Sequence, residues 1–272
     1  MVIKQAIIPV AGRGTRFYPA TLASPKEMLP VINKPLIQYV VEELIDAGVT
    51  EIYFVINSQK KNIEEHFDAY FSRDLSAYMA PEDQLRIQRA TFTYLRQPQA
   101  LGLGHAIWCA KHVVNNEPFF VVLPDEFLPV IPQCSGCIHA MIKQYDGSGD
   151  SVIALQEVSA NEVDRYGIAD IEGKAVKKII EKPSIGSVSS RSAVIGRYLL
   201  TAQCMEVLSN YQYNTAGGEI QLTPCLDHMA KQGSLSAVHY QGKRFDCGQT
   251  EGFLKANMYM AETMNILVNE GS

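Results

Sequence analysis

The sequence predicts an α/β protein with a mainly parallel sheet. Two observations carry this prediction: short apolar runs read as buried strands, and the segments between them place apolar residues at helical spacing. Such alternation favours a parallel sheet covered by helices. We find no internal repeat and no clear linker in the 272 residues. Since a domain typically spans about 150 residues, this length is also compatible with one large domain. We expect a single domain over 1–272.

The first half contains three expected strands and one well-marked helix. The strands are Ala6–Val10, Ile52–Ile56 and Phe119–Leu123. Residues 35–47 carry their apolar side chains along one helical stripe. Pro35 suits the first turn of this helix, and Gly48 suits the position just after its end. A second helical stretch runs through Ile63 and Phe67.

The second half is more mixed. Its expected strands are Ser151–Val158, Gly167–Ile171, Val194–Leu199 and Ser234–Tyr240. Pro183–Ser192 contains Pro, Gly and several Ser and is expected to be a loop. Thr223 followed by Pro224 resembles an N-cap and first helical residue, opening a helix toward Met229.

Composition excludes several classes of protein. The net charge is −5, from 24 Lys and Arg against 29 Asp and Glu, which argues against a nucleic-acid partner. No window approaches 18 apolar residues and no export signal is evident, so we expect neither a membrane span nor secretion. Six scattered cysteines are then expected to be reduced thiols, and the expected compartment is the cytoplasm.

A glycine-rich segment follows the first strand. Gly12 and Gly14 allow the backbone to approach a phosphate or a base closely. A dinucleotide fingerprint needs a further glycine where Phe17 stands, and the Gly-Lys-Ser/Thr of a P-loop is also missing. An ordinary turn is the alternative. Arg16 and Lys26 nearby favour a ligand with several negative charges, such as a triphosphate.

An ordered set of short motifs runs through the whole chain. It comprises Gly12-x-Gly14-Thr15-Arg16, Pro25-Lys26-Glu27-Met28-Leu29-Pro30, Gln97, Gly102-Leu103-Gly104, Leu123-Pro124-Asp125, Tyr166-Gly167, Glu181-Lys182-Pro183, Gly218-Glu219-Ile220-Gln221-Leu222-Thr223 and Asp246-Cys247-Gly248. This set resembles the sugar-1-phosphate nucleotidyltransferases, most nearly their uridylyltransferase branch. The resemblance implies a Rossmann-like, mixed but mainly parallel sheet flanked by helices, similar to the glycosyltransferase-A fold. It also implies a nucleotide-binding half at about 1–130, a sugar-binding half at about 131–272, and a homo-oligomer of two or four copies.

The resemblance also implies a reaction, the transfer of the uridylyl group of UTP to glucose 1-phosphate with release of pyrophosphate. The nucleophile is already an anionic oxygen, so catalysis is mainly charge neutralisation and in-line positioning. On this basis Arg16 and Lys26 neutralise the triphosphate, and Lys182 holds the sugar phosphate. Mg²⁺ prefers carboxylate and phosphate oxygens. Asp125 and Asp246 match the family's metal ligands.

The remaining site residues follow from the same resemblance. Those matching the nucleotide side are Ala11, Gly12, Gly14, Thr15, Gln97 and Gly102; those matching the sugar side are Gly167, Glu181 and Glu219. The Gln97 amide can offer both a donor and an acceptor to uracil. Lys243 is a further candidate for a phosphate contact.

Two other functions stay open at this point: a thymidylyltransferase that uses dTTP, and a non-catalytic regulatory paralogue. The charged motif residues are present, which disfavours the second. Leu22 stands where the family usually has Lys, which removes one peripheral cation. Cys134 and Cys137 form a CxxC without a second ligand pair, so we interpret them as a chance pair on a helix. His105 is expected to be a packed side chain rather than a substrate contact.

Overall fold

The structure is a computed structural model that describes residues 2–114, 116–129, 136–214 and 218–266. Within these ranges one large sheet contains β1 (Gln5–Pro9), β4 (Glu51–Ile56), β5 (Thr91–Arg96), β6 (Phe119–Val122), β8 (Ser151–Glu157), β9 (Gly167–Glu172), β10 (Ala175–Glu181), β11 (Ser192–Leu200) and β12 (Leu235–His239). Two short ribbons pair β2 (Pro30–Val31) with β3 (Lys34–Pro35), and β7 (Glu126–Phe127) with β13 (Phe245–Asp246).

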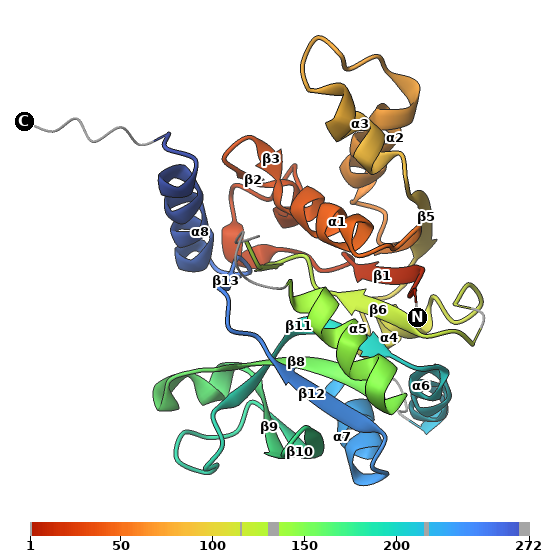
Figure 1. Cartoon of the computed structure of the whole chain (residues 1–272), viewed down its shortest axis with the longest axis vertical. Helices are drawn as coiled ribbons and strands as arrows, with labels where there is room; N and C mark the ends of the chain where they lie inside the picture. The colour runs from red at the N-terminus through yellow and green to blue at the C-terminus, as the bar shows by residue number, and fades with distance from the viewer. Residues whose placement is uncertain (1, 115, 130–135, 215–217, 267–272) are drawn as a thin grey trace, which may run out of the picture.

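Helices cover this sheet and connect its strands, except the last helix, α8 (Thr250–Thr263), which follows β13 and packs against β13 and β2 (Figure 1). They are α1 (Leu36–Asp46), α2 (Lys61–Ser72), α3 (Pro81–Ile87), α4 (Leu103–Trp108), α5 (Cys137–Ser148), α6 (Ala202–Asn214), α7 (Thr223–Lys231) and α8 (Thr250–Thr263). Three short 3₁₀ segments are η1 (Thr15–Phe17), η2 (Lys26–Met28) and η3 (Ala160–Arg165). In the described part of the chain, no helix is long and apolar enough to cross a membrane.

The strand order is β5-β4-β1-β6-β11-β8-β12-β10-β9. The run β5-β4-β1-β6 is parallel throughout, and so is the pair β8–β12. Strand β11 is antiparallel to both β6 and β8, and β10 is antiparallel to β12 and β9. The mixed α/β fold that we expected is confirmed. In the large sheet, the first-half strands pair with one another only in parallel, whereas the second half combines the parallel pair β8–β12 with antiparallel pairs.

Alternating side chains give the sheet a core on each face. Ala6 and Ile8 of β1 pack with α1, α2, α3 and α5. Ile7, between them, packs with α4, α6 and α7 on the other face. This alternation is the two-residue period of a strand that is buried on both sides. Consequently the first apolar run reads as a continuous hydrophobic stretch in the sequence.

Helix ends agree with the sequence in one case and differ in another. α1 ends as expected, with Gly48 after it at φ +96°. α7 begins at Thr223 itself, Leu222 is its N-cap residue, and Pro224 is the second helical residue. The prediction that Thr223 is the cap is therefore wrong. Its hydroxyl instead donates to Oε2 of Glu181 at 2.5 Å.

Two strands of the large sheet were not predicted from the sequence, nor were the four two-residue strands of the ribbons. β5 lies at the edge of the sheet, where most of its side chains are half-buried, so its apolar alternation is weak. β10 contains an irregularity in its pairing with β9 between Val176 and Lys178. Such a bulge interrupts the two-residue period on which strand prediction depends. Of the CxxC pair, Cys137 is the buried first residue of α5, while Cys134 lies outside the described residues.

Candidate active site

The β7–β13 ribbon brings two distant aspartates together. Asp246 pairs with Glu126 in this ribbon, and the Cys247 amide donates to the Asp125 carbonyl at 2.7 Å. A Cβ placed on Gly248 would lie 3.0 Å from Oδ2 of Asp125 and 3.0 Å from Oδ1 of Asp246. The two carboxylates therefore face each other across Gly248, where a larger side chain would crowd both.

These two carboxylates can bind a magnesium ion whose remaining ligands come from substrate phosphates and water. Among the described residues no group of three or more His, Cys, Asp or Glu side chains is arranged to hold a metal. Mg²⁺ commonly takes only one or two carboxylates and completes its shell with substrate phosphates and water. Asp246 is oriented by the Gly248 amide at Oδ1 and by Nε2 of Gln249 at Oδ2. The donor set thus fits a metal that binds together with a phosphorylated substrate.

Lys26 forms an ion pair with Asp125, one of the two aspartates. Nζ of Lys26, in η2, donates to Oδ2 of Asp125 at 2.5 Å. Burial alone would raise the pKa of Asp125, but the Lys26 ammonium outweighs it and holds that pKa below the usual range. Burial lowers the pKa of Lys26, whereas Asp125 and Glu27 raise it, with a net increase. Glu27 is itself anchored by a buried ion pair with Lys60 at 2.7 Å, which fixes η2 beneath Lys26.

A cavity of about 240 Å³ opens beside these groups. Six residues that the sequence analysis assigned to catalysis, metal and sugar meet in its lining: Arg16, Asp125, Gly167, Glu181, Lys182 and Asp246. They come from η1, the turn after β6, the start of β9, the end of β10 and β13. Parallel and mixed sheets place their ligand sites at such strand ends. The cavity also contains residues not assigned from sequence, among them Arg165 and Tyr166.

The backbone at Lys182 is strained. Its φ is +45°, a left-handed value that is uncommon for a residue with a side chain and is often found at functional sites. The Lys182 amide donates to the Tyr166 carbonyl at 3.0 Å. Next to it, Glu181 accepts the Thr223 hydroxyl. These contacts hold Glu181 and Lys182 at the cavity, although both residues are exposed.

A second cavity, of about 350 Å³, lies on the other side of the glycine-rich segment. Ala11 and Gln97 line it, together with Arg13, Tyr18, Asn57, Ser58, Gln59, Pro98 and Ala100. Nε2 of Gln97 donates to the Gly102 carbonyl at 3.1 Å and lies 3.0 Å from Nδ1 of His105. A carbonyl can only accept, which fixes the amide orientation. Gln97 therefore offers only its acceptor oxygen, not the donor–acceptor pair that we expected. His105 is buried and bonded, as expected.

Gly102 is required by its surroundings. Its φ is +92°, and a Cβ there would lie 2.6 Å from the carbonyl oxygen of Ile220. The same Ile220 carbonyl accepts the Gly104 amide at 2.8 Å, and the Ile220 amide donates to Leu101 at 2.7 Å. Glu219 is exposed beside Gly102 and is not among the residues that line the smaller cavity. The structure therefore does not bring Glu219 to the other sugar-side residues.

The remaining predicted residues lie near these cavities without lining them. Gly14 has φ +65° at the start of η1 and accepts the Thr21 hydroxyl at its carbonyl. Gly12 and Thr15 are exposed in the same segment. Lys243 is also exposed and lines neither cavity, in contrast to its buried neighbour Arg244. The structure thus gives no support to a phosphate contact by Lys243.

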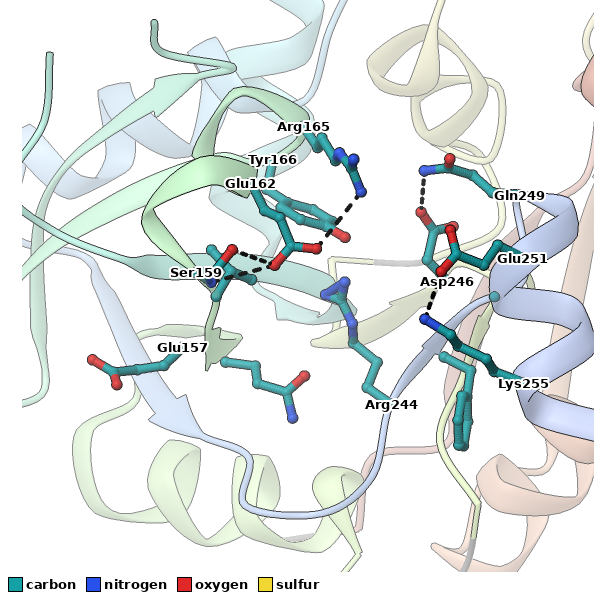
Figure 2. A pocket seen from close by; sticks show the side chains of 14 residues that line it. Glu157, Ser159, Glu162, Arg165, Tyr166, Arg244, Asp246, Gln249, Glu251 and Lys255 are labelled. Carbon is teal, nitrogen blue, oxygen red and sulfur yellow. Dashed lines mark hydrogen bonds and ion pairs between the residues drawn. The ribbon is translucent and has the colours of Figure 1, made fainter. Parts of the chain in front are cut away.

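Sequence reasoning missed Glu126 and Arg244. Nε of Arg244 lies 3.3 Å from Oε2 of Glu126, and its guanidinium stacks 4.7 Å from the centre of the Tyr166 ring. Burial and the carboxylates of Asp125 and Asp246 raise the pKa of Glu126 to about 7, with Arg244 opposing them. Figure 2 shows Arg244 among the polar side chains of a third cavity, which shares Asp246 and Tyr166 with the smaller one. The sequence offered one clue to these residues: Glu126 follows Asp125, and Arg244 stands two residues before Asp246.

Comparison with known proteins places this geometry in a class. A family model described as nucleotidyl transferase matches residues 5–263. The chain therefore belongs to the nucleotidyl transferase family. A UTP–glucose-1-phosphate uridylyltransferase 1 of Staphylococcus saprophyticus is 39% identical over 96% of this chain and 93% of its own. A UTP–glucose-1-phosphate uridylyltransferase of Pseudomonas aeruginosa is 39% identical over 97% of this chain and 98% of its own.

Solved structures give the same picture. A UDP-glucose pyrophosphorylase complexed with UDP-glucose is 35% identical, covers 96% of this chain and 99% of its own, and has a TM-score of 0.86. A UTP-bound UGPase from Acinetobacter baumannii is 34% identical, covers 99% of this chain and all of its own, and has a TM-score of 0.84. The likeness extends over both halves of the sheet.

Proposed function

We propose that this protein transfers the uridylyl group of UTP to glucose 1-phosphate, giving UDP-glucose and pyrophosphate. One observation carries the proposal: a single cavity gathers the cations Arg16 and Lys182 and the carboxylates Asp125 and Asp246 beside a polar strand end. That set matches a reaction between two anionic substrates. Relatives with this activity in their names, at 39% identity over nearly the whole chain, support it further.

The reaction needs no general base. A phosphate oxygen of glucose 1-phosphate forms a new bond to the α-phosphorus of UTP while the bond from that phosphorus to the bridging oxygen of pyrophosphate breaks. Lys182 holds the sugar phosphate, and Glu181, oriented by Thr223, accepts bonds from sugar hydroxyls. Arg16 and Lys26 neutralise the charge of the triphosphate and of the departing pyrophosphate. The base occupies the larger cavity beside Ala11 and Gln97.

Asp125 and Asp246 are the residues that would hold Mg²⁺. A bound ion would supply positive charge that offsets the repulsion between the two anionic substrates. Lys26 contributes to the same charge balance from the protein side, because its ammonium already contacts Asp125. We expect removal of divalent metal with EDTA to abolish turnover.

The two halves of the chain are proposed to bind different substrates. We propose one domain over 1–272 in which the segment of about 1–130 binds the nucleotide and that of about 131–272 binds the sugar. The smaller cavity combines Arg16 from the first segment with Gly167, Glu181 and Lys182 from the second. Assembly into dimers or tetramers and a cytoplasmic location complete the proposal; light scattering of the purified protein tests the assembly.

A direct assay tests the function. The protein is incubated with UTP, glucose 1-phosphate and MgCl₂, and both UDP-glucose and pyrophosphate are measured. Parallel reactions contain dTTP in place of UTP, or EDTA. Formation of both products with a higher kcat/KM for UTP supports the proposal. Preference for dTTP would make the protein a thymidylyltransferase, and absence of any turnover would favour a non-catalytic paralogue; either result contradicts the proposal.

A further inference from the structure

Arg244 is a buried cation beside the β7–β13 ribbon. Its side chain is 6% exposed, and that of its partner Glu126 is 11% exposed. Glu126 follows Asp125 in the chain, and Arg244 stands two residues before Asp246. The ion pair therefore joins β7 to the residue just before β13, with Glu126 lining the smaller cavity and Arg244 lining the third one. It fixes the segments that carry both aspartates.

The guanidinium of Arg244 also contacts Tyr166, which precedes the proposed sugar-binding residue Gly167. It lies 4.7 Å from the centre of the Tyr166 ring, a stacking distance for an arginine over an aromatic face. The Tyr166 carbonyl accepts the amide of Lys182, and Tyr166 immediately precedes Gly167. Arg244 thus contacts, through one planar group, Glu126 of the ribbon and the ring of Tyr166, whose backbone carbonyl bonds the Lys182 amide.

Charge explains why a cation is needed at this position. Asp125, Glu126 and Asp246 bring three carboxylates close together, and like charges at short range oppose one another. Lys26 contacts the first of them and Arg244 the second. Nη1 of Arg244 is buried and makes no hydrogen bond to a described residue. Arg244 is therefore placed for its charge and its stacking face rather than for a full set of hydrogen bonds.

We propose that Arg244 is a positioning residue that couples the metal-binding aspartates to the sugar-phosphate site. This inference rests on the proposed function, since it assigns Asp125 and Asp246 to Mg²⁺ and Lys182 to the sugar phosphate. Arg244 acts through Glu126 on the aspartates and through Tyr166 on Lys182. It touches neither substrate, and its loss uncouples metal binding from sugar-phosphate binding.

Three variants test the proposal: Arg244→Met, Arg244→Lys and the double variant Glu126→Gln/Arg244→Met. For Arg244→Met we expect the half-saturating Mg²⁺ concentration and the KM for glucose 1-phosphate to rise about 10-fold or more, as for other groups that orient metal ligands. The KM for UTP changes much less. Calorimetric titration of UDP-glucose at several Mg²⁺ concentrations gives a second readout that does not depend on turnover, and its Mg²⁺ dependence shifts in the same direction.

The other variants distinguish the effect of the Arg244 charge from the effect of its stacking on Tyr166. Arg244→Lys keeps the charge but loses the planar stack, so its Mg²⁺ dependence stays close to wild type while the KM for glucose 1-phosphate rises. In the double variant the neutral Gln no longer needs a cation, and Mg²⁺ dependence returns toward wild type. Arg191→Met is the matched control, because it removes the same charge from an exposed pair with Glu157 at 3.5 Å. It leaves both constants unchanged.

Several results would overturn the inference. They are a folded Arg244→Met protein with wild-type constants, an equal rise in both KM values with unchanged Mg²⁺ dependence, and a double variant without recovery. If Arg244→Met does not melt cooperatively, the Arg244→Lys and double variants decide. A wild-type protein that forms no UDP-glucose contradicts the proposed function instead. Wild-type turnover with unaffected Arg244 variants contradicts this inference alone.

Discussion

The ammonium nitrogen of Lys26 lies 2.5 Å from Oδ2 of Asp125, although 99 residues separate them in the chain. Lys26 belongs to η2 near the glycine-rich segment, and Asp125 follows the central strand β6. The contact places a cation proposed for the triphosphate directly on a carboxylate proposed for the metal. Under the proposed function, the Lys26 ammonium would have to leave Asp125 for phosphate oxygens when substrate and metal bind.

The first prediction concerns the charge of Lys26. Replacing it by Met removes the cation that we propose to stabilise the pyrophosphate leaving group, and we expect kcat/KM for UTP to fall about 100-fold or more. Lys26→Arg retains a positive charge and keeps a larger part of the activity. Steady-state kinetics with UTP varied at saturating glucose 1-phosphate measure both variants. Activity of Lys26→Met within a few-fold of wild type would remove Lys26 from the catalytic set.

The second prediction concerns the fit of Gly102 against Ile220. Gly102→Ala adds a Cβ at a positive φ and in contact with a carbonyl oxygen, so we expect a loss of about 2–4 kcal/mol in the free energy of unfolding. Gly186→Ala is the control, because Gly186 has φ +81° with open space around it and tests the backbone effect alone. Urea denaturation measures both variants. Equal losses would show that the Ile220 contact contributes nothing.

Many site residues could be assigned from the sequence because they belong to short motifs that occur in a fixed order along the chain. Arg16, Asp125, Lys182 and Asp246 were assigned from sequence, and the structure brings them to one cavity. Motif residues of this kind stand next to strand ends, and the sheet topology then decides where they meet. Glu219 was assigned in the same way, yet its segment pairs with the Gly102 turn and takes the side chain elsewhere.

The rest depended on contacts that no local pattern records. Strands β7 and β13 contain two residues each, too few to show a period, although their pairing joins the two aspartates. Arg244 is buried by that ribbon, while a charged residue in sequence is normally interpreted as exposed. The Thr223 hydroxyl could serve a helix end or a side chain 42 residues away, and only the packing of α7 against β10 decides between them.

The third prediction tests the bond from Thr223 to Glu181. Thr223→Val keeps the shape of the side chain and removes the hydroxyl, which leaves Glu181 free to turn away from the position that we propose for the sugar. We expect the KM for glucose 1-phosphate to rise about 10-fold, since a hydrogen bond to a charged group contributes that much. The KM for UTP should remain unchanged, and Thr223→Ser should behave as wild type. A parallel rise in both KM values would indicate a general disturbance of α7.

The fourth prediction concerns stability at acid pH and His66. Nε2 of His66 lies 3.0 Å from Oε1 of Gln38, an atom that only accepts, so this nitrogen carries the hydrogen of the neutral ring. Burial lowers the pKa of His66 below 6.5 in the folded protein. Below pH 6.5 the unfolded chain therefore binds more protons at this site than the folded chain does, and stability falls as the pH falls.

Replacing His66 by Gln removes this proton uptake while an amide can still donate to Gln38. We expect the melting temperature of His66→Gln to decline less steeply than that of the wild type as the pH is lowered from 6.5. The exposed His112 provides the control, and His112→Gln should follow the wild-type curve. Thermal melts across this range measure the slopes. Parallel curves for His66→Gln and wild type would mean that His66 takes up a proton equally well in the folded and unfolded chain, contrary to its burial against Phe67 and Tyr70.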